Sequence, residues 1–188
     1  MKLFLTAACF LILTGCLAFG VPYTSDRDKK FAYAYMLMNQ GRAVPAEKLI
    51  GEALKAYQES GTELGAAEAY HTYGNFYKND LYHGKFKRYF ESAGTYDGTY
   101  ERSLENFQKA LELYAKHNDY PGVTKSSFGL ANVYGIQDKK QKACETYDLS
   151  LTSWDQAKRE NPDAKLLILT RFSNVPDMID AFKKKEEC

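Results

Sequence analysis

Small and large apolar side chains recur at helical spacing along most of the chain. Near the C-terminus, for example, Val175, Met178, Ile179 and Phe182 are three or four residues apart and would share one face of a helix. Of the four positions between them, Asp177 and Asp180 are charged. Runs of β-branched residues are few, so the pattern predicts an all-α fold.

A second pattern is an internal repeat. Residues 53–77 and 110–134 align without a gap at a shift of 57 positions, and other residues recur at a shift of 40. The difference of 17 indicates an insertion between Tyr77 and Ser103. The repeating unit is therefore about 40 residues long, a length typical of stacked helix pairs. The pairs matched at 57 include Ala53 with Ala110, Tyr57 with Tyr114, Gly65 with Gly122, and Asn75 with Asn132.

The repeated segments resemble the tetratricopeptide repeat family. The stretches YGNFY (73–77) and LANVY (130–134) are similar to the first helix of that repeat, and ERSLENFQKALELY (101–114) is similar to the second. The resemblance implies a helical-repeat solenoid of three such helix pairs, with a 17-residue insertion in the second pair and a C-terminal capping helix. Within a domain of residues 27–188, the repeats would span about 27–60, 63–117 and 120–157, with the cap at 161–185.

Paired helices need small side chains where their axes approach closely. The aligned repeats carry only Ala, Gly or Ser at the expected contact points, and larger apolar residues lie between them. The first repeat fits least well, because Lys30 stands where an apolar residue is usual. The nine contact points are Ala34, Ala46, Ala53, Gly74, Ser103, Ala110, Ala131, Ala143 and Ser150.

The repeat pattern stops after Trp154. Asn161 followed by Pro162 is a helix-start pattern, and it predicts that a helix begins there. Arg171 stands where a fourth repeat would need a small residue. We therefore expect the tail to cover the last apolar face of the solenoid rather than to extend it.

The N-terminus has the layout of a secretory signal peptide, with Lys2 followed by an apolar run that is too short to span a bilayer. This run ends in Leu13, Thr14, Gly15 and Cys16, which resembles the lipobox of bacterial lipoproteins. The resemblance implies removal of residues 1–15, lipidation of Cys16 and a tether over 16–26. Leu17, which is not the Asp of an inner-membrane retention signal, favours the outer membrane, with the protein facing the periplasm. The alternative is an ordinary signal peptide with a chance Gly-Cys.

Composition limits the partners and the redox state. Without residues 1–15, the chain carries 24 Lys and Arg against 24 Asp and Glu, which gives no electrostatic case for nucleic-acid binding. Cys144 and Cys188 would remain in a compartment that permits disulfides, and they could pair with each other.

The first helices of the three pairs would line the concave side of the solenoid. Carrying over the family's groove positions gives Asp28, Phe31, Tyr35, Met38, Glu68, His71, Asn75, Lys78, Lys125, Phe128, Asn132 and Ile136. In this family such asparagines often contact the ligand chain, and a carboxamide can both donate to and accept from a peptide backbone. The alternative is that they brace neighbouring helices. From this set we predict a partner-binding site of Tyr35, His71, Asn75, Lys78, Lys125, Phe128 and Asn132.

The insertion, residues 79–100, is a second candidate surface. It interleaves basic residues, among them Lys87 and Arg88, with aromatic residues. Aromatic residues and arginine are concentrated in protein interfaces and also suit a lipid headgroup layer. The alternative is an extra helical hairpin that packs its aromatic side chains on the solenoid.

No metal-ligand spacing, nucleophile motif or phosphate-binding loop stands out, so we expect neither an enzyme nor a cofactor. The resulting hypothesis is a lipid-anchored, periplasm-facing repeat protein that binds and positions a protein partner at the bacterial envelope, as pilotins and other adaptors do. Two alternatives stay open. One is an immunity-type lipoprotein that inhibits a toxin, and the other is an envelope enzyme or small-ligand binder.

Overall fold

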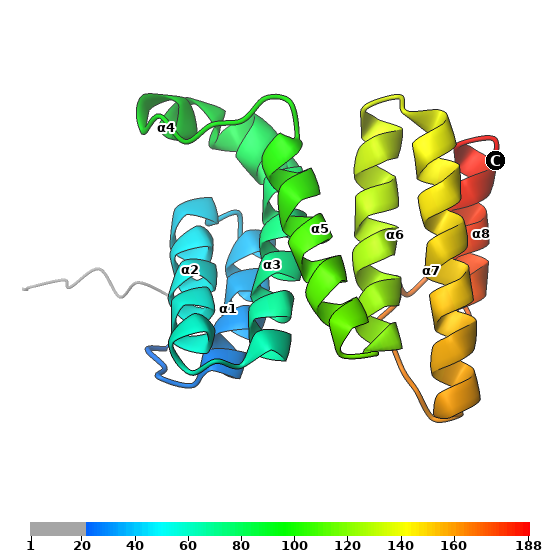
Figure 1. Ribbon diagram of the computed structural model, residues 1–188. Coiled ribbons are helices and arrows are strands. Elements are labelled where there is room, and N and C mark those ends of the chain that lie inside the picture. Colours follow the sequence, from blue (N-terminus) through cyan, green and yellow to red (C-terminus); the bar gives the residue numbers. More distant parts are fainter. Residues whose placement is uncertain (1–21) are drawn as a thin grey trace, which may run out of the picture.

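The computed structural model describes residues 22–188, and this part of the chain is all-helical, which confirms the all-α prediction (Figure 1). The expected signal peptide and Cys16 lie outside the described residues. In chain order, the elements are α1 (Arg27–Asn39), α2 (Ala43–Glu59), α3 (Glu63–Lys78), a π-helical turn η1 (Leu81–Lys85), α4 (Lys87–Ser92), α5 (Glu101–Lys116), α6 (Tyr120–Ile136), α7 (Lys140–Glu160) and α8 (Val175–Lys185).

The helices pack in antiparallel pairs that stand side by side in chain order (Figure 1). The pairs are α1 with α2, α3 with α5, and α6 with α7, while α2–α3 and α5–α6 contacts join one pair to the next. In the turns that follow α1, α2, α5 and α6, the residue two positions after the helix has left-handed backbone, namely Gly41, Gly61, Asn118 and Asp138. Gly, Asn and Asp are the residues that adopt this conformation most easily, so the chain reverses direction at these points.

Small residues lie where the helices meet. All nine predicted contact points are buried, and the alanines among them have no exposed surface. A Cβ added to Gly65 would lie 2.0 Å from the Tyr57 ring, and one added to Gly122 would lie 2.2 Å from the Tyr114 ring. These two contacts involve residues that match at the shift of 57, so the same packing arrangement occurs twice.

The unusual Lys30 is explained by a specific partner. Its side chain is buried, with 7% of the residue exposed, and it forms an ion pair with Glu52 on α2. A buried ammonium needs such a partner because removal from water is costly. A charged pair thus occupies the place of an apolar contact in the first helix pair.

The insertion folds as a short hairpin of η1 and α4 that projects beyond the α1–α2 pair (Figure 1). Tyr82 and Phe90 are buried in the same apolar cluster as Phe76 and Tyr77 of α3. The Tyr82 hydroxyl donates to the Thr95 carbonyl at 2.7 Å. The aromatic side chains of the insertion therefore hold it against the helix pairs.

The tail differs from the sequence prediction, because no helix begins at Asn161. After α7 ends at Glu160, residues 164–169 are extended and the next helix starts only at Val175. Ala164 is buried, and Leu166 and Ile168 pack against the α7–α8 cluster, whereas Leu167 is fully exposed. This two-residue alternation is typical of an extended strand, and it overrides the Asn-Pro signal. We call residues 161–174 the strap.

A disulfide closes the C-terminal end. Cys144 of α7 is joined to Cys188, just beyond α8, with the two Cα atoms 5.6 Å apart. The bond holds the end of α8 against α7, while Val175 and Ile179 of α8 pack in one apolar cluster with α7 residues such as Trp154.

Candidate partner-binding groove

Two adjoining cavities of about 410 and 550 Å³ lie between the first helices of the pairs, the strap and α8. They share lining from α3, α6 and the strap, and we call them together the groove. Of the predicted partner-binding residues, those that line the groove are Tyr35, His71, Asn75, Lys78, Lys125, Phe128 and Asn132. The groove positions implied by the family resemblance are therefore side chains that the fold brings together from α1, α3 and α6.

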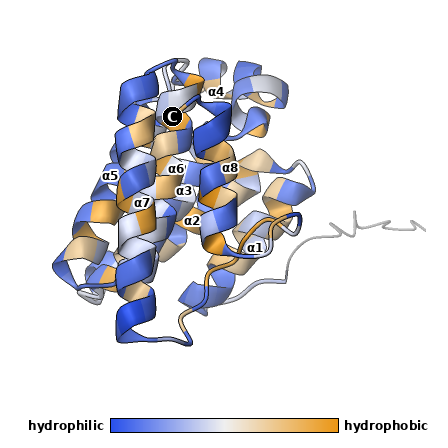
Figure 2. Cartoon of the chain, turned by 90° about the vertical axis from the view of Figure 1, so that its right-hand side faces the viewer, coloured by the Kyte–Doolittle hydropathy of each residue, from blue (hydrophilic) through white to orange (hydrophobic). Residues whose placement is uncertain are grey.

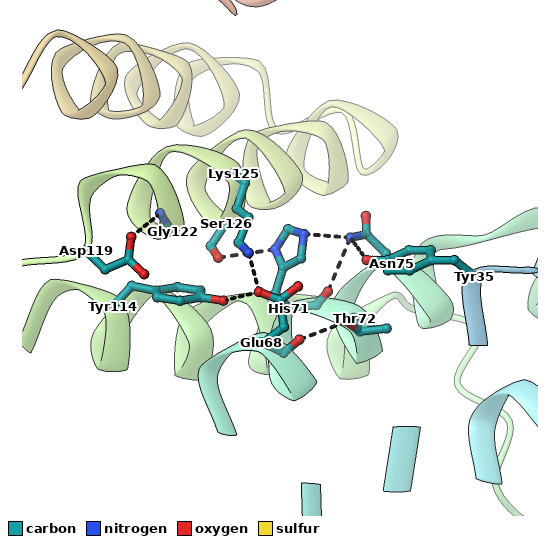
Figure 3. A network of polar contacts seen from close by, with 10 residues as sticks. All are labelled: Tyr35, Glu68, His71, Thr72, Asn75, Tyr114, Asp119, Gly122, Lys125 and Ser126. Carbon is teal, nitrogen blue, oxygen red and sulfur yellow. Dashed lines mark hydrogen bonds and ion pairs between the residues drawn. The ribbon is translucent and has the colours of Figure 1, made fainter. Parts of the chain in front are cut away.

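His71 is buried and uncharged in the floor of the groove (Figure 3). The Asn75 amide donates to its Nε2 at 2.9 Å, so Nε2 accepts and Nδ1 carries the proton, which faces the Ser126 hydroxyl at 3.2 Å. Burial, reinforced by the Lys125 ammonium, lowers the pKa of His71 to about 3. The imidazole thus acts as a neutral connector between α3 and α6.

Glu68 is tied down beside His71. It forms an ion pair with Lys125 and accepts a hydrogen bond of 2.7 Å from the Tyr114 hydroxyl (Figure 3). Although burial acts to raise it, the net pKa of the carboxyl is lowered, chiefly by Lys125. The charges of Glu68 and Lys125 are therefore paired with each other within the protein.

Asn75 and Asn132 form hydrogen bonds only through their amide nitrogens among the described residues. The Asn75 amide nitrogen contacts His71 and, at 3.4 Å, the Tyr35 hydroxyl, and the Asn132 amide donates to the Phe128 carbonyl at 2.6 Å. Within residues 22–188, no donor reaches the carboxamide oxygen of either side chain. In Figure 3 the Asn75 oxygen points away from the network. Each asparagine thus braces its own helix and also presents an acceptor to the groove.

Lys78 lies one turn further along α3 and lines both cavities. Burial lowers the pKa of its ammonium to about 8. Its ammonium lies over the face of the Phe107 ring, 5.6 Å from the ring centre, and among the described residues no carboxylate forms an ion pair with it.

Sequence reasoning missed the outer wall of the groove. Leu166, Leu167 and Leu169 of the strap line both cavities, and Met178 and Phe182 of α8 line the first. In Figure 2 the strap leaves the end of α7, reaches towards α1 and returns to α8. The helical spacing of Val175 to Phe182 predicted an apolar helix face, but nothing in the pattern indicated that this face borders the groove.

Other predicted positions lie elsewhere. Lys87 and Arg88 are exposed on α4 and line neither cavity of the groove. Phe31 is buried, stacked on Tyr57, and Asp28 accepts a hydrogen bond from the Tyr57 hydroxyl, so α1 turns both residues away from the groove. The expected concave face of α1 is thus limited to Tyr35 and Met38.

No group of three or more His, Cys, Asp or Glu side chains in residues 22–188 is arranged to hold a metal ion. Likewise, no helix of the described part is both long enough and apolar enough to cross a membrane. Comparison of the chain with protein-family models and with curated proteins found no match.

Proposed function

We propose that this chain is a lipid-anchored tetratricopeptide-repeat protein that faces the periplasm and positions a protein partner at the bacterial envelope. The groove would hold an extended segment of that partner. The observation that carries the proposal is that the residues selected from the repeat register line one groove, with two carboxamide oxygens left for a ligand.

An extended peptide suits this lining. Its backbone N–H groups can donate to Asn75 and Asn132, which lie on neighbouring first helices, α3 and α6. Its side chains can contact apolar groups such as Phe128, one turn before Asn132 on α6, and Met178 on α8. Pockets with an apolar lining and a few placed polar groups are typical of ligand sites.

The repeat assignment is supported by packing that recurs. The contact of Tyr57 with Gly65 has a counterpart in the contact of Tyr114 with Gly122. In both cases a tyrosine of the second helix of one pair lies against a glycine of the first helix of the next pair, as expected when one helix pair is stacked on a similar one.

The anchor would keep the groove near the membrane. Pro22 is six positions after Cys16, and six residues reach at most about 20 Å when fully extended. Replacement of Cys16 by Ala should leave the protein unprocessed or release it from membranes. Unchanged processing together with unchanged membrane retention would refute the anchor.

Affinity capture from solubilised membranes tests the groove. The Asn75→Ala/Asn132→Ala double variant should lose the proteins that the wild type retains, whereas Asn106→Ala should retain them. Asn106 is a matched control, since its amide donates to the carbonyl four residues before it, as in Asn132, but it lies on α5 outside the groove. Deletion of residues 80–98 tests the insertion separately. Equal capture by the wild type and the double variant would refute the groove as the partner site.

A further inference from the structure

Lys78 occupies a point where several cavities meet. Besides the two cavities of the groove, it lines a third of about 350 Å³ between the end of α3, the end of α6 and α8. Its side chain therefore borders the groove, and its ammonium lies over the face of the Phe107 ring, where the surrounding helices exclude most of the solvent. A ligand in either half of the groove would lie next to this side chain.

The surrounding carboxylates do not neutralise Lys78. Glu68 is committed to Lys125 and Tyr114. Asp80 and Glu186 border the third cavity, where Lys185 is 3.8 Å from Glu186, and neither carboxylate forms an ion pair with Lys78. A cation removed from water without a counter-charge destabilises the free protein, so an anion supplied from outside would bind there favourably.

The other side chains that line the groove indicate which kind of molecule would supply this anion. The oxygens of Asn75 and Asn132 can accept hydrogen bonds from N–H groups, and Phe128, Met178 and Phe182 offer an apolar surface. A fatty acid would supply the carboxylate and the apolar chain but has no N–H group. A peptide with an acidic side chain between apolar residues supplies all three.

We propose that Lys78 is the anion-recognition residue of the groove, and that the partner segment carries an Asp or Glu side chain flanked by apolar residues. This inference rests on the proposed function and specifies the chemistry of its ligand. The Lys78 ammonium donates to the incoming carboxylate, while the two asparagines accept from the backbone on either side. Charge-assisted hydrogen bonds of this kind are stronger than neutral ones and are geometrically selective.

The test uses two libraries of capped pentapeptides with mixed apolar residues, which are identical except for Glu or Gln at the centre. Affinity selection with the chain from Pro22 onward measures the retained amount of each library. That chain contains every described helix and the disulfide, and its circular dichroism checks the fold. The wild type should retain the Glu library about tenfold more than the Gln library, the factor expected for one charge-assisted hydrogen bond.

Variants of the chain distinguish the role of Lys78 from peptide binding by the groove in general. Lys78→Met should retain both libraries equally, and Lys78→Arg should keep a preference for Glu. Lys109→Met, on α5 outside the groove, should behave as the wild type. Asn75→Ala/Asn132→Ala should weaken retention of both libraries without changing their ratio.

Each other outcome contradicts one claim. Equal retention of both libraries by the wild type, or a Glu preference that survives Lys78→Met, would overturn the role of Lys78 and leave the groove intact. Retention of neither library would overturn peptide binding in the groove as well. A competition with octanoate tests the peptide assignment. If octanoate displaces a retained peptide as effectively as the same free peptide does, a carboxylate with an apolar chain suffices for binding, and the peptide assignment is wrong.

Discussion

The groove owes its polar character to a few side chains with fixed protonation states. His71 is held neutral by burial and by its bond to Asn75, and the charges of Glu68 and Lys125 neutralise each other. Lys78 stays without an anionic partner among the described residues. These differences arise from neighbours that are distant in the chain, such as Ser126, which lies 55 positions after His71.

The buried His71 makes stability depend on pH. Its pKa is about 3 in the folded state and 6.5 when unfolded, so only the unfolded state binds the proton between these values. The free energy of unfolding should fall as the pH drops below 6.5, with His71 contributing a loss of about 2 kcal/mol by pH 5. Denaturant unfolding of the wild type and of His71→Gln, each at pH 5 and at a pH above 6.5, measures how much of the change in the free energy of unfolding is due to His71. An identical pH dependence in the two proteins would contradict a buried, neutral His71.

The close approach at two glycines gives a packing prediction. Gly65→Ala and Gly122→Ala should each lower the free energy of unfolding by about 1–3 kcal/mol, because the new methyl group overlaps the ring of Tyr57 or Tyr114. Gly84→Ala is the control, since nothing lies within 4 Å of a Cβ at that position. Denaturant titrations provide the values, and equal stability of all three variants would contradict the packing.

The groove residues could be predicted from the sequence because the resemblance to the tetratricopeptide repeat family implies which positions of each first helix face the groove. The internal repeat, which matches Asn75 to Asn132, places those positions on α3 and α6. The register does not determine which of these side chains pair with each other. Phe31 illustrates the limit, since its ring stacks on Tyr57 instead of facing the groove.

At the scale of elements, the strap shows where local signals are insufficient. Asn161 and Pro162 form a good helix start, yet the following residues bury alternate side chains, Ala164, Leu166 and Ile168, against α7 and α8. The strap follows this path instead of forming a helix because it packs on a surface made by distant segments, and this tertiary packing overrides the local helix propensity. The same segment forms the outer wall of the groove, so the wall could not be located before the strap was known to be extended.

The disulfide should stabilise the C-terminal end. It joins residues 44 positions apart. In the loop-entropy model, closing a loop of this length lowers the conformational entropy of the unfolded chain and so stabilises the folded state by about 4 kcal/mol. Reduction should therefore lower the melting temperature measured by circular dichroism. The Cys144→Ser/Cys188→Ser variant should melt at the lower temperature with or without reductant. A wild-type melting temperature that does not respond to complete reduction would contradict this stabilising role.

At the scale of the whole molecule, helix pairs stand in a row, with the strap and α8 closing the outer side of the groove (Figures 1 and 2). The described chain begins at the α1–α2 end, where Pro22 and Tyr23 line a cavity together with Arg42, Pro45 and Lys48. A lipid on Cys16 would therefore hold that end near the bilayer, and the groove would extend along the row from there.

Site-specific photo-cross-linking in living cells tests partner binding in the groove most directly. A photoreactive amino acid replaces either Leu167, which is exposed and lines both cavities, or Leu149, which is exposed on α7 outside the groove. The proposed function predicts a cross-linked protein partner from position 167, lost in the Asn75→Ala/Asn132→Ala background, and none from position 149. Cross-linking from position 149 alone, or equally from both positions, would contradict binding in the groove.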